Sequence, residues 1–521
     1  MSEQRDNSTK TISVVMIITL LGKVLGLVRD RMLAVHYGTG MQANAFYTAS
    51  RIPRVFFDAV FASAIAACFI PVFSQYLTKQ GKGKAFHFAG TFLTVMAALT
   101  AVLSLAGMGF AGPLVELFAD GYDEATAQLA VRLTRIMFPT VLFTGVAFSF
   151  VGILQSLDEF NIPALISTVS NLVIIGYYFT FNERFGIYGL AVAFLLGWLL
   201  QAVVQLPALK KKGYRYHPSL DWRSEGMKQV FALMLPVMVS TWVQPINLTI
   251  NSKFGSRLYG GAGVSAIEIS TNLYLIIAGV FVLSVTNVIF PKLSRQSAQG
   301  EGEAFRDTLR QTVHSTLFFV LPMCAGLMVL SRPLVSFIYG GGLFDAFSVD
   351  ITARGLVWVS LGMVGYAVQN ILSRAYFAKQ DGRTPLLAGA VSIGINIVLC
   401  MALTDRLQVA GLAIASAVSS TVYALLLLLP LERQGERVFT AGFWLDMTKT
   451  LASAAMMALG VYLVMNLLGA VLPVGKAGEL VLLGVSACSG MLIYFAAAVL
   501  LRIPEAQMVV NMAKRILKRG G

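Results

Sequence analysis

Seven charged side chains interrupt the first two apolar stretches of the chain, at positions where a membrane span normally carries none. They are Lys23, Arg29, Asp30, Arg31, Arg51, Arg54 and Asp58. Lys23 and Asp30 are seven residues apart and share one face of a helix, as do Arg51, Arg54 and Asp58 at spacings of three and four. Ionisable groups at bilayer depth are costly, and they usually face a water-filled cavity or a charged partner.

The excess of positive charge in this group suits an anionic ligand, because five cations stand against two acids. Arg binds phosphate oxygens through two parallel hydrogen bonds, whereas Lys acts as a compact point charge. We therefore predict a diphosphate-binding site in a water-filled cavity. Its residues are Lys23, Arg29, Asp30, Arg51 and Arg54.

A second interpretation of the same residues is a set of ion pairs that brace the packing of helices. Arg54 would pair with Asp58, four residues further on, and either Lys23 or Arg29 would pair with Asp30. This interpretation needs no ligand. The sequence leaves both interpretations open.

Three more ionisable residues lie inside predicted spans. Arg132 and Arg354, in the fourth and tenth spans, suit a cavity lining and a brace within each half of the molecule equally well. Glu268 is the acid of the eighth span. It is expected to pair with a cavity arginine, to bind a coupling cation, or simply to complete a structural ion pair.

The composition places the chain in a membrane. Of its 521 residues, 56% are hydrophobic and 13% are charged, and the mean hydropathy is +0.72. Soluble domains are about 45–50% apolar and about 25% charged, so a soluble enzyme, a disordered chain and a fibrous protein are excluded. Basic cytoplasmic loops explain the net charge of +14 better than nucleic-acid binding does. An all-α polytopic membrane protein remains.

Neither a disulfide framework nor a metal site is expected. The four cysteines, at positions 68, 324, 400 and 488, lie singly in apolar runs, and the four histidines are scattered. The first apolar run is interrupted by Lys23 and has no small-residue cleavage site. We therefore interpret it as a retained span and not as a removed signal peptide.

Fourteen membrane spans are predicted from apolar runs of about 20 residues. Their limits are 11–36, 45–76, 85–112, 126–154, 160–181, 186–208, 226–252, 263–291, 308–331, 351–373, 384–403, 407–431, 445–470 and 479–501. With the amino terminus inside, the cytoplasmic segments hold 26 Lys and Arg and the outer segments hold 6, as the positive-inside rule requires. Both termini are therefore predicted to be cytoplasmic.

An internal repeat divides the chain. Four pairs of segments match at offsets of 219 to 222 residues: 36–40 with 258–263, 69–86 with 289–305, Arg132 with Arg354, and 189–193 with 411–415. Six spans per copy give both copies the same orientation, so we predict two pseudo-symmetric six-helix lobes, an arrangement common in transporters. The predicted domains are 1–222, 223–437, and 438–521 with the last two spans and a basic tail.

Several of these motifs resemble the MurJ (MviN) lipid II flippase family. The resemblance is carried by Leu21–Asp30, Tyr37–Gly40, Arg51–Pro53, Phe69–Pro71 and Ala375–Pro385, and it extends over essentially the whole chain. It implies the fold of the multidrug/oligosaccharidyl-lipid/polysaccharide exporters. It also implies flipping of undecaprenyl-diphosphate-linked disaccharide-pentapeptide across the bacterial inner membrane, with the last two spans forming a groove for the prenyl tail.

The family's functional residues carry over only in part. Arg29 and Asp30 match, Arg51 falls on a basic position, and Lys23 keeps the charge of a family arginine. Two other family arginines fall on Phe57 and Asn272, and a family acid falls on Asn44; Arg54, one turn away, would compensate for Phe57. These departures leave open whether the cargo is lipid II or another polyprenyl-diphosphate glycan, such as an exopolysaccharide or O-antigen unit.

The expected mechanism is alternating access, in which the lobes rock around the cationic cavity. No nucleotide-binding loop is present in the sequence, so the membrane potential or a monovalent cation gradient is the expected driver. No cofactor, nucleic acid or obligate protein partner is indicated; the expected partners are the lipid-linked glycan and membrane lipids. A membrane glycosyltransferase is a weaker alternative, because no outer segment exceeds roughly twenty residues.

Overall fold

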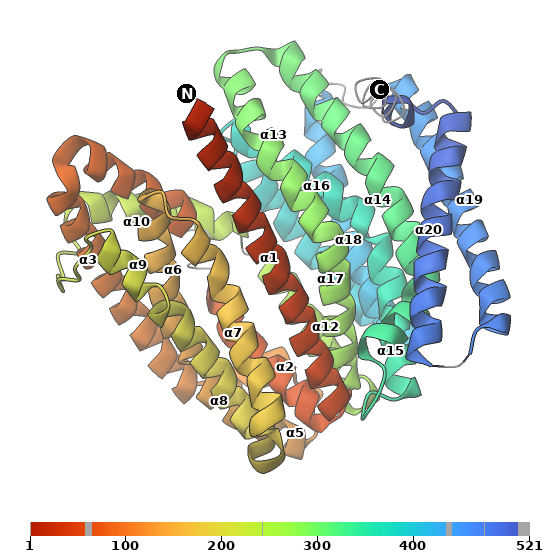
Figure 1. The fold of residues 1–521 in the computed structure, drawn as a ribbon, viewed down its shortest axis with the longest axis horizontal. Helices are drawn as coiled ribbons and strands as arrows, with labels where there is room; N and C mark the ends of the chain where they lie inside the picture. Colours follow the sequence, from red (N-terminus) through yellow and green to blue (C-terminus); the bar gives the residue numbers. More distant parts are fainter. Residues whose placement is uncertain (1, 58–64, 242, 434–439, 474, 509–521) are drawn as a thin grey trace. The chain divides into compact units, whose positions relative to one another are not determined.

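The protein is built from helices. The computed structural model describes residues 2–57, 65–241, 243–433, 440–473 and 475–508, and within these ranges the only paired extended residues are Gly341 and Phe344, which form an isolated bridge. The prediction of an all-α fold is confirmed. The chain divides into two compact units, Met1–Ser265 and Ala266–Gly521, and Figure 1 labels most of their helices.

The first unit runs from a long amino-terminal helix to the start of α12. Its elements are α1 (Ser2–Tyr37), α2 (Met41–Phe57), the π-helical turn η2 (Ile65–Phe69), α3 (Ile70–Gly109), α4 (Ala111–Phe118), α5 (Glu124–Met137), α6 (Thr140–Ser156), α7 (Asn161–Thr180), α8 (Asn182–Val203), α9 (Leu206–Lys211), α10 (Glu225–Thr241), α11 (Val243–Ser256), the 3-10 turn η3 (Tyr259–Gly261) and the first residues of α12 (Ala262–Tyr274). Helix α1 packs on α7, α2 on α5, and α3 on α6.

This unit is longer than the predicted first lobe, 1–222. Helix α10 packs against η2 and α3, and α11 packs against α2 and α4, so the unit extends to Ser265. The predicted domains 1–222, 223–437 and 438–521 follow the sequence repeat. A division by packing does not test that symmetry, and the three domains stay a prediction.

The second unit contains the rest of α12 and the last eight α-helices. Its elements are the π-helical turn η4 (Leu275–Gly279), α13 (Val280–Ala298), α14 (Gly302–Tyr339), α15 (Ala346–Leu361), α16 (Met363–Ala378), α17 (Arg383–Leu407), α18 (Val409–Arg433), α19 (Ala441–Val471) and α20 (Lys476–Leu500). Helices α19 and α20 pack on α14 around Phe318, whose carbonyl accepts a hydrogen bond of 2.5 Å from the Tyr494 hydroxyl.

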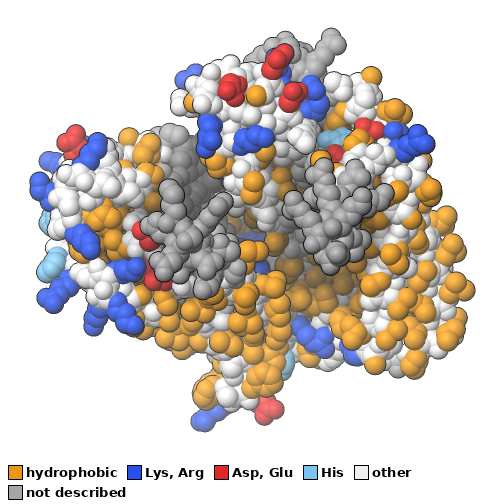
Figure 2. All heavy atoms as spheres, turned by 45° about the horizontal axis from the view of Figure 1, so that its top comes forward, with side chains coloured by type: hydrophobic (Ala, Val, Ile, Leu, Met, Phe, Trp, Pro, Cys, Tyr) orange, Lys and Arg blue, Asp and Glu red, His pale blue; other side chains and the backbone are white. Residues whose placement is uncertain are grey.

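Ten helical stretches in the described ranges are long and apolar enough to cross a membrane, or eleven if α15 and α16, bent by 43°, form one span. Each of these eleven overlaps one of the predicted spans. The other three predicted spans fall on α1, on α2 with the residues that follow it, and on α10 with α11. Figure 2 shows broad areas of exposed apolar side chains, as expected for a lipid-facing surface. A multi-span membrane protein is therefore confirmed, and the count of fourteen stays a prediction.

Gly107 allows α3 to approach the junction of α5 and α6. A methyl group at this position would overlap the Phe138 ring, whereas a methyl group at Gly109, two residues on, would meet nothing within 4 Å. We predict that Gly107→Ala destabilises the protein by about 1–3 kcal/mol through overpacking. Thermal unfolding of the purified protein should show a lower Tm for Gly107→Ala and an unchanged Tm for the matched control Gly109→Ala. Equal Tm values for the two variants would contradict this packing.

Candidate functional site

Arg29 is the best-defined residue of the predicted site. Its Nε and Nη2 donate to Asp30 Oδ1 at 3.0 and 2.7 Å, and its Nη1 donates to Asn171 Oδ1 of α7 at 3.1 Å. Asn171 in turn donates to the Gly22 carbonyl of α1 at 3.0 Å. The guanidinium is therefore held by two helices that pack directly on each other.

This arrangement leaves part of the guanidinium available for a ligand. A guanidinium has five N–H donors, and the contacts within the described part of the chain use three of them. The Arg29 side chain keeps 32% of its surface exposed, against 13% for Asp30. Asp30 thus orients Arg29 and neutralises much of its charge, so the ion-pair interpretation is realised for this pair while two donors stay free.

The other three cations of the predicted site differ in their surroundings. Lys23 is exposed on α1 and has no hydrogen-bond or ion-pair partner among the described residues. Arg51 is half-buried, and its Nη1 donates to the Leu248 carbonyl of α11 at 3.0 Å. Arg54 is exposed at the end of α2. The structure brings Arg29 and Asp30 into direct contact.

Two sequence predictions in this region fall on residues that the structure does not fully describe. Phe57, where the resemblance led us to expect an arginine, ends α2, and its side chain lies outside the described part of the chain. Asp58, the proposed partner of Arg54, lies outside the described residues altogether.

The weaker candidates are spread over both units. Arg132 is exposed on α5, in the first unit, and Arg354 on α15 pairs with Asp350 one turn away at 2.8 Å while 64% of its side chain stays exposed. Among the described residues, the two arginines related by the sequence repeat therefore differ in pairing. Glu268 and Asn272 are half-buried on α12, in the second unit.

Sequence reasoning missed a group of contacts around the start of α2, which we call the Asn44 cluster: Asn44, Thr48, Tyr122 and Ser265. Asn44 Oδ1 accepts hydrogen bonds from the backbone N–H of Ser265, at 3.3 Å, and from its hydroxyl. Tyr122 donates to the Asn44 carbonyl at 2.9 Å and lies 2.7 Å from the Thr48 hydroxyl. Asn44 and Ser265 are 221 residues apart, and only the departure of Asn44 from the family pattern pointed to this position.

A charged group lies in the same unit, between the α4–α5 loop and α11; we call Asp120, Lys253 and Arg257 the Asp120 cluster. Arg257 donates twice to the Asp120 carboxylate, at 2.9 and 2.6 Å, and Lys253 Nζ lies 3.3 Å from Asp120 Oδ2. The backbone N–H of Gly121 also donates to Ser256 Oγ at 3.0 Å. These contacts hold the end of α11 against the α4–α5 loop, within the first unit.

The Asp120 cluster predicts an acid-sensitive contribution to stability. The hydrogen bond from Arg257, aided by Lys253 against the effect of burial, lowers the pKa of Asp120 from its ordinary value of 3.8. A carboxylate with a lowered pKa stabilises the folded state above its ordinary pKa, and this contribution disappears as the pH falls through the lowered value. We expect Asp120→Asn to lower Tm at about pH 7, and we expect the Tm difference to shrink as the pH falls through the lowered pKa of Asp120. A Tm difference that persists unchanged in acid would contradict this assignment.

Solved structures share the fold of this chain. The chain matches the structure "Lipid II flippase MurJ, inward closed conformation" with a TM-score of 0.77, 23% identity, and coverage of 94% of this chain and 98% of that chain. It also matches an inward-facing multidrug resistance MATE family transporter of the MOP superfamily, with a TM-score of 0.65, 15% identity, and coverage of 82% and 98%. The chain therefore shares the fold of both solved structures.

Sequence comparison gives the family. The model of the family "Lipid II flippase MurJ" matches residues 33–479. The lipid II flippase MurJ of Burkholderia cenocepacia is 30% identical over 455 residues, covering 85% of this chain and 87% of the relative. The probable lipid II flippase MurJ of Vibrio cholerae is 30% identical over 435 residues, covering 81% and 82%. The chain belongs to the lipid II flippase MurJ family, as its motifs predicted.

Proposed function

We propose that this chain is a flippase that moves lipid II, an undecaprenyl-diphosphate-linked peptidoglycan precursor, from the inner to the outer leaflet of the bacterial inner membrane. The family match over residues 33–479 carries this proposal. The arrangement at Arg29 supports it, because a guanidinium oriented by Asp30 and Asn171 presents its remaining donors to an anion without reorganising. The protein acts as a transporter, with membrane lipids and the lipid-linked glycan as its partners.

The diphosphate is the part of the cargo that needs the protein. Moving an ion into hydrocarbon without compensation costs tens of kcal/mol in a simple solvation estimate, so a site that replaces its hydration lowers the barrier. We assign phosphate contacts to Lys23, Arg29, Arg51 and Arg54 and an orienting role to Asp30. Among the described residues no carboxylate pairs with Lys23, so its positive charge is available to the diphosphate.

Alternating access requires contacts that open and close. The Asn44 cluster and the Asp120 cluster join α11 and the start of α12 to α2 and the α4–α5 loop, on the side that the charge pattern assigns to the outside. We assign these contacts to the state in which the outer side is closed. With both termini cytoplasmic, the membrane potential, worth about 2.3 kcal/mol per charge per 100 mV, or a monovalent cation bound at Glu268, would drive the cycle.

The test is translocation of labelled lipid II by the purified full chain in vesicles, with an O-antigen precursor on the same prenyl diphosphate as the alternative cargo. The proposal expects protein-dependent movement of lipid II and growth of a strain depleted of its own lipid II flippase when this chain is expressed. Movement of the O-antigen precursor alone, with no rescue of growth, would reassign the cargo and leave the flippase mechanism standing.

A further inference from the structure

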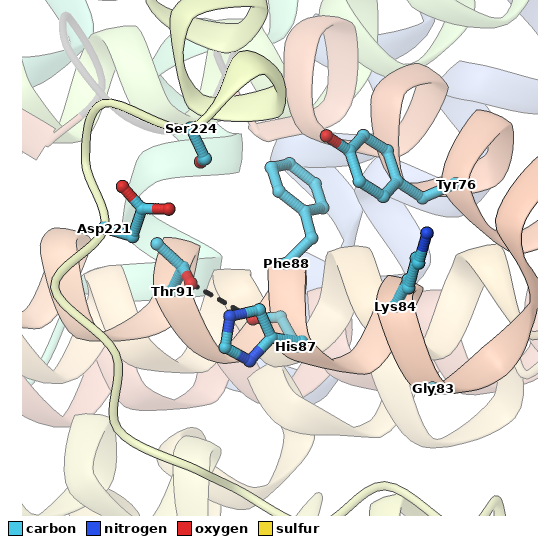
Figure 3. A pocket seen from close by; sticks show the side chains of 8 residues that line it. All are labelled: Tyr76, Gly83, Lys84, His87, Phe88, Thr91, Asp221 and Ser224. Atoms are coloured by element: carbon cyan, nitrogen blue, oxygen red, sulfur yellow. Dashed lines mark hydrogen bonds between the residues drawn. The ribbon is translucent and has the colours of Figure 1, made fainter.

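A cavity lies in the first unit between α3 and the linker that joins α9 to α10. The linker crosses α3 closely: the backbone N–H of Ser219 donates to Thr94 Oγ1 at 3.3 Å, and the Tyr216 hydroxyl lies 3.0 Å from the same oxygen. Gly90 is required at this crossing, because a Cβ there would lie 2.6 Å from the His217 carbonyl oxygen. Beside the crossing, a cavity of about 320 Å³ remains. It is lined by Tyr76, Gly83, Lys84, His87, Phe88, Thr91, Asp221 and Ser224 (Figure 3).

The charged side chains of the cavity stand on opposite walls. Figure 3 shows Asp221 on the linker side and Lys84 on the α3 side, with His87 and Phe88 between them. Neither Lys84 nor Asp221 has an ion-pair partner among the described residues. They are therefore too far apart to pair with each other, and a space separates an acid from a base.

Two further features make this space suitable for a ligand. The Ser224 hydroxyl is buried and has no hydrogen-bond partner within the part of the chain that the structure describes, although a buried hydroxyl normally has one. Tyr76 and Phe88 stack at 4.9 Å between ring centroids and form an apolar wall. The cavity thus offers a cationic side, an anionic side, an unused hydroxyl and an apolar surface.

We propose that this cavity binds the phosphoethanolamine headgroup of an aminophospholipid. The phosphate is bound by Lys84 and His87 on the α3 side, and the primary ammonium donates to the Asp221 carboxylate and to the Ser224 hydroxyl oxygen on the linker side. The cavity adjoins the start of the predicted span 85–112, which places it at the level of the lipid headgroups. The site is separate from the residues assigned to lipid II and does not depend on the proposed cargo.

The arrangement discriminates between lipid headgroups. Phosphatidylglycerol has no ammonium, so Asp221 repels it; the trimethylammonium of phosphatidylcholine has no N–H to donate to the carboxylate. Asp221→Asn therefore has opposite effects on two lipids. It weakens phosphatidylethanolamine binding by about tenfold, through loss of a charge-assisted hydrogen bond, and it strengthens phosphatidylglycerol binding.

The experiment is native mass spectrometry of the detergent-purified full chain titrated with each of the three phospholipids. The wild type should retain phosphatidylethanolamine in preference to the other two, Lys84→Ala should weaken both phosphatidylethanolamine and phosphatidylglycerol, and Lys82→Ala, an exposed lysine outside the cavity, should change neither. If Asp221→Asn does not accumulate as folded protein, two other variants replace it. Ser224→Ala should weaken phosphatidylethanolamine binding, and Asp221→Glu should retain it. Unselective retention by the wild type, or an Asp221→Asn variant with unchanged phosphatidylethanolamine binding, overturns the proposal.

A soluble competitor separates the lipid from a free metabolite with the same chemistry. Soluble O-phosphoethanolamine has no acyl chains, so it gains no binding energy from the apolar surface beside the cavity. It should therefore displace phosphatidylethanolamine only at concentrations far above that of the lipid. If it binds as tightly as the lipid, the cavity belongs to a soluble ligand and the lipid assignment is wrong.

Discussion

Arg29→Ala is expected to reduce lipid II translocation in vesicles by at least about tenfold, since each charge-assisted hydrogen bond lost to the diphosphate is worth roughly 1.5–3 kcal/mol. The two donors that Arg29 keeps free in the described structure are those that would bind phosphate oxygens. Arg29→Lys keeps the charge but cannot bind in the bidentate mode, so an intermediate rate is expected. Arg184→Ala, which removes an exposed arginine on α8 that stacks on Phe185, is the matched control and should be neutral.

A purely structural role for Arg29 would give a different pattern. Removing the guanidinium also leaves the Asp30 carboxylate, which is 13% exposed, without its partner, so some loss of stability is expected. Asn171→Ala removes the hydrogen bond between α7 and the Arg29 guanidinium but leaves the Arg29 charge in place. If Arg29→Ala and Asn171→Ala lower Tm and translocation in parallel, Arg29 braces the helices; if Arg29→Ala lowers translocation far more at equal Tm, Arg29 binds the cargo.

A disulfide between cysteines introduced at positions 44 and 265 is expected to stop translocation. The side chains of Asn44 and Ser265 are in direct hydrogen-bond contact, so cysteines at the two positions would be direct neighbours. If the Asn44 cluster must open in each transport cycle, oxidised Asn44→Cys/Ser265→Cys protein should fall to the background rate, and reduction should restore it.

The controls for this experiment follow from the native cysteines. Cys68, Cys324 and Cys400 are buried and Cys488 is exposed, so Cys488→Ser provides a background without an accessible native thiol. Each single cysteine variant should translocate lipid II with or without oxidant. A cross-linked protein that works at the full rate would show that the Asn44 cluster stays closed during transport, and it would remove this cluster from the mechanism.

Local spacing predicted some of these contacts and not others. Lys23 and Asp30 share a helix face, but seven residues of helix separate them by about 10 Å along the axis, so the neighbouring Arg29 pairs with Asp30 instead. Arg354 pairs with Asp350 at a spacing of four, as helix geometry allows. Arg132, its repeat partner, has no acid four residues earlier. Such short-range pairs are open to sequence reasoning because the helix itself sets the distance.

The sequence by itself determined the all-helical membrane fold and the family, because hydropathy, motif spacing and helix periodicity are local properties of the chain. The charged residues of the candidate site stay a prediction from the sequence. Only the tertiary structure decided that Arg29 is held by Asn171, 142 residues away, that Asp120 binds Arg257 across 137 residues, and that Asp221 faces Lys84 across a cavity. These partners meet because distant helices pack together, and no periodicity within one helix encodes which residue of another helix will lie opposite.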